Sequence, residues 1–404
     1  MALVVIQFLF AVLVLAMAAA SHALLRELLP EREAGLTALV FLSLPVSLYL
    51  GFKVLSEIPS ALLTTIACWA YLRSFRAVQT KARLGFLGVA VLALSAGIFA
   101  RFTSFLLFGG FIVGLLVWRH ERFHWASVVI RAGVVFTLSL GVIAIAYTVI
   151  GVTIDQFTEL IRSTMRRTPG LGVKIFALAM TVQCFAPVLL WALKPPYPRP
   201  VLAGIVWAGI CALPFIVSSQ YLEPRYFYMA LLPLAVIMHS GLQGIARRFW
   251  PGNMMTAWSL MLGGIVLANR MLFAPLMPYE LDQRQFAKTM TELVQRYGEA
   301  TYICLWISDY SFLRFAFPHQ GLRLALSEVD PEDRGVFHTE GFQRWVGDNR
   351  YIGSLTVLKQ AREPWIYIGW TFNPVVLQLE NPTLTVPRTF SSRCGGGVTY
   401  RSSG

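Results

Sequence analysis

Long apolar runs separated by short polar stretches fill the first two-thirds of the chain. Because an α-helix needs roughly 20 apolar residues to cross the hydrocarbon core of a bilayer, this pattern predicts about ten transmembrane helices. They are expected at residues 3–25, 36–55, 58–75, 84–100, 102–118, 128–150, 173–193, 201–217, 226–245 and 254–276. Four prolines inside these runs predict kinks, which spanning helices tolerate. They are Pro45, Pro187, Pro214 and Pro233.

The pattern changes after residue 278, where short alternating runs replace the long apolar ones. Strands alternate there with short helices, which indicates a small α/β domain over residues 279–404. The strands are expected at residues 301–307, 322–326, 351–359 and 364–368. The glycine-rich tail after residue 389 is expected to be mobile. The chain therefore reads as a polytopic α-helical membrane protein, residues 1–278, with a small C-terminal α/β domain.

Composition separates the two parts further. The chain is 56% hydrophobic and 14% charged, with a mean hydropathy of +0.61, whereas a soluble domain carries roughly 45–50% apolar and about 25% charged residues. The net charge of +13 lies entirely in residues 1–278, which hold 21 basic and 8 acidic residues, because the 13 basic and 13 acidic residues of 279–404 cancel. A basic excess confined to the membrane part indicates membrane topology and anionic ligands, and argues against nucleic acid.

Lys and Arg collect in every second loop, which predicts the orientation of the helices. The loops after the third, fifth, seventh and ninth apolar runs are basic and are expected to be cytoplasmic. Their basic residues are Arg73, Arg76, Lys81, Arg83, Arg119, Arg122, Lys194, Arg199, Arg247 and Arg248. The opposite face then holds Glu57 and Arg101, and we expect the C-terminal α/β domain to be extracytoplasmic. Residues 151–172 on that face have the apolar spacing of an amphipathic surface helix.

Glu57 is the acidic residue most closely flanked by apolar sequence, within the stretch Lys53-Val54-Leu55-Ser56-Glu57-Ile58-Pro59-Ser60. A carboxylate at the edge of a membrane is costly to place and is usually functional. Two structural roles are also open for it. It can pair with Lys53 one helical turn earlier, or stabilise the amino end of the helix that follows.

Several cations share the predicted outer face with Glu57. Arg101 and Arg225 each stand where an apolar run breaks, and Lys53 precedes Glu57 by four positions. Arg and Lys are the usual partners of phosphate groups, so these residues indicate a site for an anionic ligand. The alternative is that the long side chains reach toward lipid headgroups without a specific ligand.

The five cysteines follow no metal-ligand spacing. Cys68, Cys184 and Cys211 fall in apolar runs and are expected to pack there. Cys304 and Cys394 share the C-terminal domain and form a candidate disulfide if that domain is extracytoplasmic. No metal site and no Gly-rich phosphate loop is predicted. No cofactor follows from the residues, and a divalent cation stays open.

Three stretches resemble the GT-C membrane glycosyltransferases of the protein mannosyltransferase and aminoarabinose transferase type. Residues 55–62, Leu-Ser-Glu-Ile-Pro-Ser-Ala-Leu, are similar to the family's acidic residue at a helix start. Residues 95–104, Ser-Ala-Gly-Ile-Phe-Ala-Arg-Phe-Thr-Ser, are similar to its junction of two helices with a basic residue. Residues 223–226, Glu-Pro-Arg-Tyr, followed by Leu-Leu-Pro-Leu at 231–234, look like its Arg-Tyr and Leu-Pro segment. Together the likeness extends over most of residues 1–278.

The resemblance implies transfer of a sugar from a polyprenyl- or dolichyl-phosphate donor to a lipid, glycan or protein acceptor on the extracytoplasmic face. It implies that Glu57 is catalytic, as the general base that takes a proton from the acceptor hydroxyl. It also implies donor-binding residues, because the departing lipid phosphate needs compensating positive charge. These are Lys53, Arg101, Arg225 and Tyr226. The expected location is a bacterial plasma (inner) membrane, whose lipids are further partners.

One departure from the family pattern leaves the role of Glu57 open. The family normally begins with an additional helix and an outer loop that bears its main catalytic Asp, whereas Met1 opens into what resembles the next helix. We therefore expect either an N-terminally truncated chain or a Glu57 that serves as a supporting carboxylate or a substitute base. A secondary transporter is an alternative, although no internal repeat relates two halves. A non-catalytic lipid-binding membrane subunit is another.

Overall fold

The computed structural model describes most of the first two-thirds of the chain and five strands beyond it. The described residues are 2–50, 56–118, 123–151, 175, 178–179, 181–194, 198–218, 224–273, 291–292, 294–295, 301–304, 323–327, 351–352, 365–370 and 396–401. The chain divides into two compact units, Met1–Phe273 and Ala274–Gly404.

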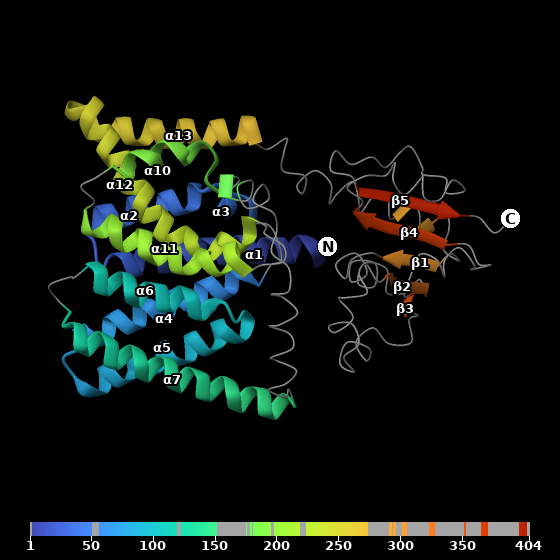
Figure 1. Ribbon diagram of the computed structural model, residues 1–404, viewed down its shortest axis with the longest axis horizontal. Coiled ribbons are helices and arrows are strands. Elements are labelled where there is room, and N and C mark those ends of the chain that lie inside the picture. Colours follow the sequence, from blue (N-terminus) through green and yellow to red (C-terminus); the bar gives the residue numbers. More distant parts are fainter. Residues whose placement is uncertain are drawn as a thin grey trace. The chain divides into compact units, whose positions relative to one another are not determined.

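Helices build the described part of the first unit (Figure 1). The α-helices are α1 (Ala2–Leu25), α2 (Glu31–Ser43), α3 (Pro45–Leu50), α4 (Glu57–Arg76), α5 (Thr80–Ala100), α6 (Ser104–Trp118), α7 (Trp125–Ile150), α10 (Ala186–Ala192), α11 (Arg199–Ser218), α12 (Leu231–Phe249) and α13 (Met254–Phe273). Three 3-10 helices connect them, namely η1 (Gln183–Phe185), η2 (Pro224–Ala230) and η3 (Pro251–Asn253).

Six helical stretches within the described residues are long and apolar enough to cross a bilayer. They are Phe8–Leu25, Thr80–Ala100, Trp125–Ile150, Arg199–Val217, Phe227–Phe249 and Pro251–Leu272. The chain is therefore an integral membrane protein with several spanning helices, and the total of about ten stays a prediction.

The predicted helix over 36–55 differs from the structure, where α2 and α3 are separate. Leu44 between them has an extended backbone, with ψ at 139°. The cause is Pro45, because a proline ring clashes with a helical conformation of the residue before it. Residues 84–100 and 102–118 are also separate helices, and Arg101 between them has φ −160° and ψ 117°. That extended residue turns the chain at the end of α5.

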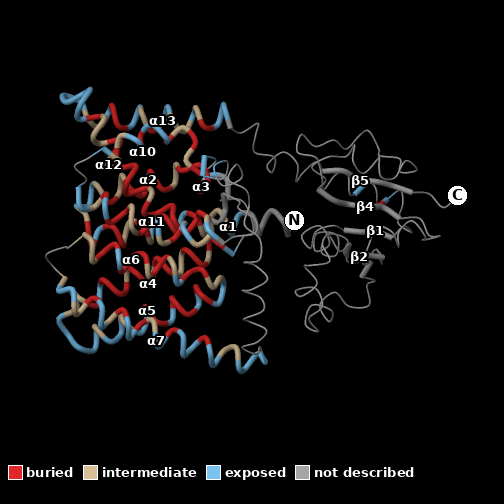
Figure 2. The backbone as a smooth tube through the Cα atoms, viewed as in Figure 1, coloured by how far each residue is buried: buried red, intermediate tan, exposed pale blue. Residues whose placement is uncertain are grey.

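The segment that contains α12 is the most buried of the six candidate spanning stretches. In the 18-residue apolar window of Phe227–Phe249, 72% of the residues are buried, compared with 17% in the corresponding window of Pro251–Leu272. The helix α12 packs against α2, α10, α11 and α13, while α4 packs against α1, α5 and α6. Exposed positions concentrate along α7 and α13, at opposite edges of the unit (Figure 2). One continuous apolar core therefore runs through the helices around α4 and those around α12.

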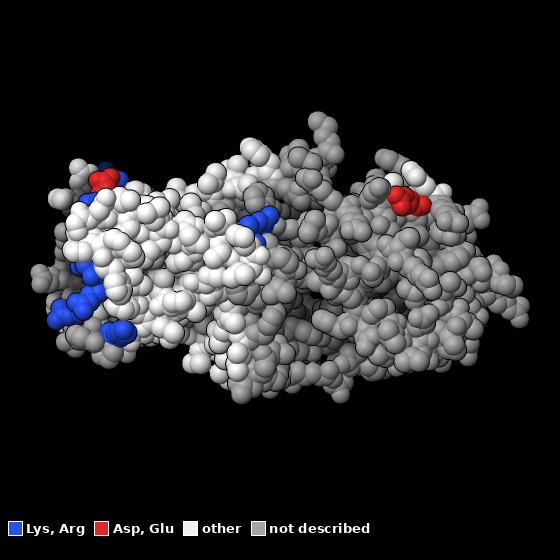
Figure 3. All heavy atoms as spheres, turned by 90° about the horizontal axis from the view of Figure 1, so that it is seen from above, with Lys and Arg blue, Asp and Glu red and all other residues white. Residues whose placement is uncertain are grey.

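The flanks of the first unit present large apolar side chains. Leu92, Ile145 and Leu260 are 65%, 67% and 71% exposed. Figure 3 shows one such flank with few charged side chains, most of its Lys and Arg lying at one end of the helices and one smaller basic patch at the other. Exposed apolar surface of this extent suits contact with lipid chains, because water would penalise it.

The second unit contains a five-stranded sheet of order β3-β2-β1-β4-β5. Its strands are β1 (Thr301–Cys304), β2 (Arg323–Ser327), β3 (Tyr351–Ile352), β4 (Trp365–Trp370) and β5 (Gly396–Arg401). The strands β1 to β4 pair in parallel, and β5 is antiparallel to β4. Parallel pairs require crossover connections of a dozen or more residues, and these lie outside the described residues, so the α/β class stays a prediction.

The strand β5 corrects the expectation of a mobile tail for part of its length. Residues 396–401 pair with β4 along six positions, from Gly396 opposite Trp370 to Arg401 opposite Trp365. The Val-Thr-Tyr sequence within β5 favours a strand, and the edge of β4 offers unpaired backbone groups that a strand satisfies.

Other predictions lie outside the described residues. These are the amphipathic helix over 151–172, most of the helices of the second unit and the side chains of Cys304 and Cys394. Of the helix predicted at the start of the second unit, residues 291–292 and 294–295 are described and are helical. Cys68 and Cys211 are buried, as predicted, and Cys184 is half-buried.

The contact between α12 and α10 predicts a sharp difference between two glycines. A Cβ added to Gly241 would lie 2.4 Å from the backbone O of Val188, while one added to Gly209 would meet nothing within 4 Å. Alanine is favoured over glycine inside a helix by about 1 kcal/mol. We therefore expect Gly241→Ala to lower the melting temperature of the purified protein and Gly209→Ala to leave it unchanged or raise it. Equal melting temperatures would contradict this packing.

Candidate functional site

Glu57 lies in the first turn of α4, and its surroundings bury it. The residue is 2% exposed, and Ser56 precedes it as the N-terminal flanking residue of the helix. A carboxylate in this position interacts favourably with the positive end of the helix dipole. The dipole alone does not offset the cost of burying a full negative charge, which requires an oppositely charged partner.

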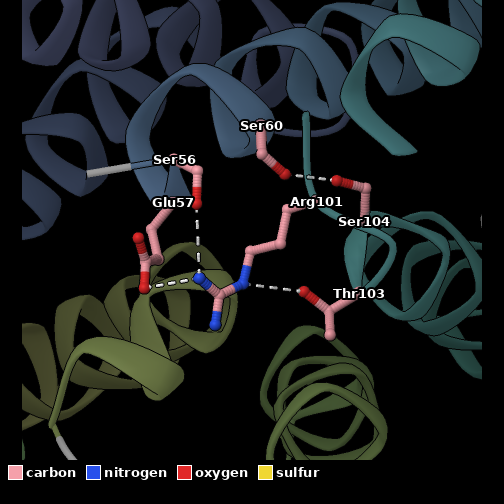
Figure 4. Close-up of polar contacts among 6 residues, drawn as sticks. All are labelled: Ser56, Glu57, Ser60, Arg101, Thr103 and Ser104. Atoms are coloured by element: carbon pink, nitrogen blue, oxygen red, sulfur yellow. Dashed lines mark hydrogen bonds and ion pairs between the residues drawn. The ribbon is translucent and has the colours of Figure 1, made fainter. Parts of the chain in front are cut away.

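Arg101 supplies that partner from the end of α5. Its Nη1 lies 2.6 Å from Oε1 of Glu57, and its side chain is 18% exposed. Its Nε donates to Thr103 Oγ1 at 3.2 Å, and its Nη1 donates to Ser56 Oγ at 3.5 Å (Figure 4). The backbone N–H of Arg101 caps α5 by donating to the carbonyl of Gly97 at 2.9 Å. The guanidinium is thus held by contacts on either side.

A layer of small polar side chains next to the ion pair keeps α4 close to α5 and α6. Ser60 is hydrogen-bonded to Ser104, whose hydroxyl also donates to the carbonyl of Gly97 at 2.9 Å. Thr64 donates to the carbonyl of Ser60 at 2.8 Å. A Cβ at Gly97 would lie 2.8 Å from Thr64 Oγ1, so only glycine allows this approach without a shift. The layer therefore fixes the distance at which Glu57 faces Arg101.

The structure brings two of the predicted site residues together, because Glu57 and Arg101 come from segments 44 residues apart and form one ion pair. Lys53 lies outside the described residues. Arg225 and Tyr226 belong to η2, which packs against α3 and α4, and their side chains are not described. His239, which is only 5% exposed in α12, is buried.

The described residues contain no group of three or more His, Cys, Asp or Glu side chains that could hold a metal ion. The arrangement around Arg101 is suited instead to an anion. A guanidinium forms strong charge-assisted hydrogen bonds to phosphate oxygens, and this one is fixed in place at the end of a helix.

No family model matches the chain, and no curated protein matches it in sequence. A solved structure does match it, namely ArnT from Cupriavidus metallidurans bound to undecaprenyl phosphate. The TM-score is 0.56 at 15% identity, over 98% of this chain and 83% of that chain, and the apo structure of ArnT gives the same values. The two chains share a fold. ArnT is an aminoarabinose transferase of the GT-C superfamily, so the resemblance seen in the sequence is confirmed at the level of the fold.

Sequence reasoning missed a second cluster of charges, at the other end of α4. Glu27 follows α1 and is 2% exposed. Its Oε1 lies 2.8 Å from Nε of Arg73, and its Oε2 lies 2.8 Å from Nη1 of Arg76. The available signal was an acidic residue directly after the apolar run 3–25. From the sequence, Arg73 and Arg76 are expected only as part of a basic cytoplasmic loop.

The hydroxyls around the first ion pair were also missed. Ser56, Ser60, Thr103 and Ser104 lie within the two stretches that carry the family resemblance, yet serine and threonine are common in helices and loops. Their contacts depend on the pairing of α4 with α5 and α6, which the sequence alone does not specify.

The ion pair predicts coupled effects on stability. Arg101→Gln leaves the buried Glu57 carboxylate without its guanidinium, which we expect to cost on the order of 3 kcal/mol of unfolding free energy. The double variant Glu57→Gln, Arg101→Gln removes both charges, so its cost should be smaller than the sum of the two single costs. Unfolding of the four proteins in mild detergent measures this. Additive losses would show that the two side chains do not interact.

Proposed function

We propose that the protein is an integral-membrane glycosyltransferase that moves a sugar from a polyprenyl-phosphate donor to a lipid, glycan or protein acceptor. The site is expected on the extracytoplasmic face of a bacterial plasma membrane. The observation that carries the proposal is the fold shared with ArnT, which was solved with undecaprenyl phosphate, over 98% of this chain. The buried Glu57–Arg101 pair gives that fold a specific place for an anion.

In this proposal Arg101 binds the phosphate of the lipid donor. Negative charge grows on that phosphate as the bond to the sugar breaks, so a fixed cation stabilises the transition state more than the ground state. Because the guanidinium is already oriented, binding requires little further ordering of the side chain. Lys53, Arg225 and Tyr226 complete the proposed donor-binding set from neighbouring segments.

Glu57 is proposed to position Arg101. Its Oε1 is engaged by the guanidinium at 2.6 Å, and the side chain is nearly buried, so its first effect is to fix the arginine. A general base must reach the proton of the acceptor hydroxyl. The alternative role of Glu57 is direct removal of this proton. A positioning role predicts weaker lipid binding when Glu57 is changed, whereas a role as the base predicts lost turnover with unchanged binding.

Binding of undecaprenyl phosphate to the full chain in nanodiscs tests the role of Arg101. Arg101→Lys keeps the positive charge but loses the planar fork that holds both Glu57 and a phosphate. We expect its affinity for undecaprenyl phosphate to fall about 10-fold, which corresponds to roughly 1.4 kcal/mol. The matched control is Arg248→Lys, at an exposed position at the end of α12, where affinity should not change. Equal affinities in the two variants would exclude Arg101 from the lipid site.

Transfer from a panel of undecaprenyl-phosphate sugars, assayed with the same preparations, tests the activity itself. We expect Glu57→Gln to weaken lipid binding, and to have little further effect in the Arg101→Lys background, because Glu57 acts through Arg101. Unchanged binding with lost turnover would instead make Glu57 the base. Lipid binding by the unaltered protein without any transfer would point to a lipid-binding subunit, and the absence of both would refute the proposal.

A further inference from the structure

The charged cluster around Glu27 forms a pocket at the end of α4 opposite Glu57. Its walls are Ala23, Arg26, Glu27, Trp69, Arg73 and Arg76, and its volume is about 170 Å³. That is several times the roughly 30 Å³ that a water molecule takes up in the liquid. The pocket therefore has room for a tetrahedral oxyanion such as a phosphate group.

Positive charge dominates the pocket. Three guanidiniums and a single carboxylate line it. Glu31 pairs with Arg26 at 3.4 Å, but both side chains are at least half exposed, at 72% and 50%. Such a surface pair contributes little. Even when Glu31 is included, one positive charge in the cluster has no compensating carboxylate.

The buried Glu27 fixes the two arginines of α4 in different ways. Arg76 is held twice, with Nη1 at 2.8 Å from Glu27 Oε2 and Nη2 donating to the Glu27 carbonyl at 3.1 Å. Arg73 is held through its Nε alone, at 2.8 Å from Glu27 Oε1, and its side chain is 44% exposed. Within the described part of the chain, no hydrogen bond engages the two Nη atoms of Arg73. An arginine has five N–H donors, and four of them are on the Nη atoms. Arg73 lines the pocket, so these four donors are available to a ligand there.

Trp69 gives the pocket one aromatic wall. The guanidinium carbon of Arg73 lies 5.9 Å from the centre of the Trp69 ring, one helical turn deeper along α4. The ring packs edge-to-face against Phe86 of α5 at 6.0 Å. Tryptophan is enriched at the level of lipid headgroups. Arginines at the end of a helix with an aromatic ring one turn further in are suited to a lipid, whose phosphate would contact the arginines and whose acyl chain would pass the ring.

The pocket is separate from the Glu57–Arg101 pair. The helix α4 has 20 residues, and at 1.5 Å per residue its two ends are about 30 Å apart, which is the thickness of the hydrocarbon core. Because α4 packs along α5, which is one of the six candidate spanning helices, the two clusters lie at opposite ends of this helix pair. The pocket is lined by residues from the end of α1 and the end of α4, and basic pockets between membrane helices bind phospholipid headgroups.

We propose that Arg26, Arg73 and Arg76 form a binding site for a phosphate group, either that of an anionic lipid headgroup or that of a soluble phosphate. The buried Glu27 orients Arg73 and Arg76, and Arg73 and Arg26 contact the ligand. The inference does not depend on the proposed transferase activity, because the pocket lies at the opposite end of α4 from Glu57 and Arg101, which are assigned to the donor site.

The full chain in nanodiscs tests the lipid source. We compare phosphatidylcholine discs with discs that contain phosphatidylglycerol, and count the anionic lipids that stay bound by native mass spectrometry. Arg73→Gln should reduce the retained phosphatidylglycerol at least 5-fold. Arg26→Gln leaves the ion pairs of Glu27 with Arg73 and Arg76 intact, and it should also reduce the retained phosphatidylglycerol. The matched control is Arg248→Gln, an exposed arginine at the end of α12, and it should retain as much lipid as the unaltered protein.

A titration with inorganic phosphate in neutral detergent tests the soluble source. Here the melting temperature of the unaltered protein and of Arg248→Gln should rise with phosphate, whereas that of Arg73→Gln and Arg26→Gln should not. If the Arg73 and Arg26 variants differ from the unaltered protein only in the phosphatidylglycerol they retain, the ligand is a lipid. If they differ only in the phosphate-dependent rise of the melting temperature, the ligand is a soluble phosphate. If all variants behave alike in both experiments, Arg73 only holds Glu27, Arg26 only pairs with Glu31, and the proposal is overturned. Transfer assays on Arg73→Gln separate this result from the proposed function.

Discussion

A carboxylate buried near a membrane needs a guanidinium partner, and the helix α4 meets this requirement at both of its ends. Glu57 in its first turn is paired with Arg101 from α5. Glu27, which follows α1, is paired with Arg73 and Arg76 in the last turn of α4. Each pair also complements the helix dipole, with the acid at the amino end of α4 and the bases at the carboxyl end. The pairs fix how α1, α4 and α5 align along the membrane.

Packing around α4 then converts that alignment into a defined site. Gly97 allows close approach to Thr64, and Ser60 bonds to Ser104, so α4, α5 and α6 meet through small polar groups. Such contacts are suited to a lipid environment, where apolar side chains gain little from association with one another. The resulting scaffold holds Arg101 at the end of α5. The chain shares its fold with ArnT, which was solved bound to undecaprenyl phosphate, and this shared fold is the basis of the proposed donor site.

The helices were predictable because each is a long apolar run bounded by polar residues, and Arg101 stood out as the one charge between two runs. The partner of Glu57 was less predictable. Lys53 is its neighbour in sequence, whereas Arg101 becomes its partner only when α4 and α5 fold back on each other. Glu27 was overlooked for the same reason, since its role depends on Arg73 and Arg76 from another helix. The break at Leu44 depends on the proline that follows it. The strand Gly396–Arg401 depends on the edge of β4, which is distant in sequence.

The most direct test of the central claim is an experimental structure of the protein in nanodiscs with undecaprenyl phosphate. The account predicts the lipid phosphate within hydrogen-bond distance, about 3 Å, of the Arg101 guanidinium, with Glu57 still holding that side chain from the other side. A phosphate bound elsewhere, with the Arg101–Glu57 pair making no contact to the lipid, would contradict it.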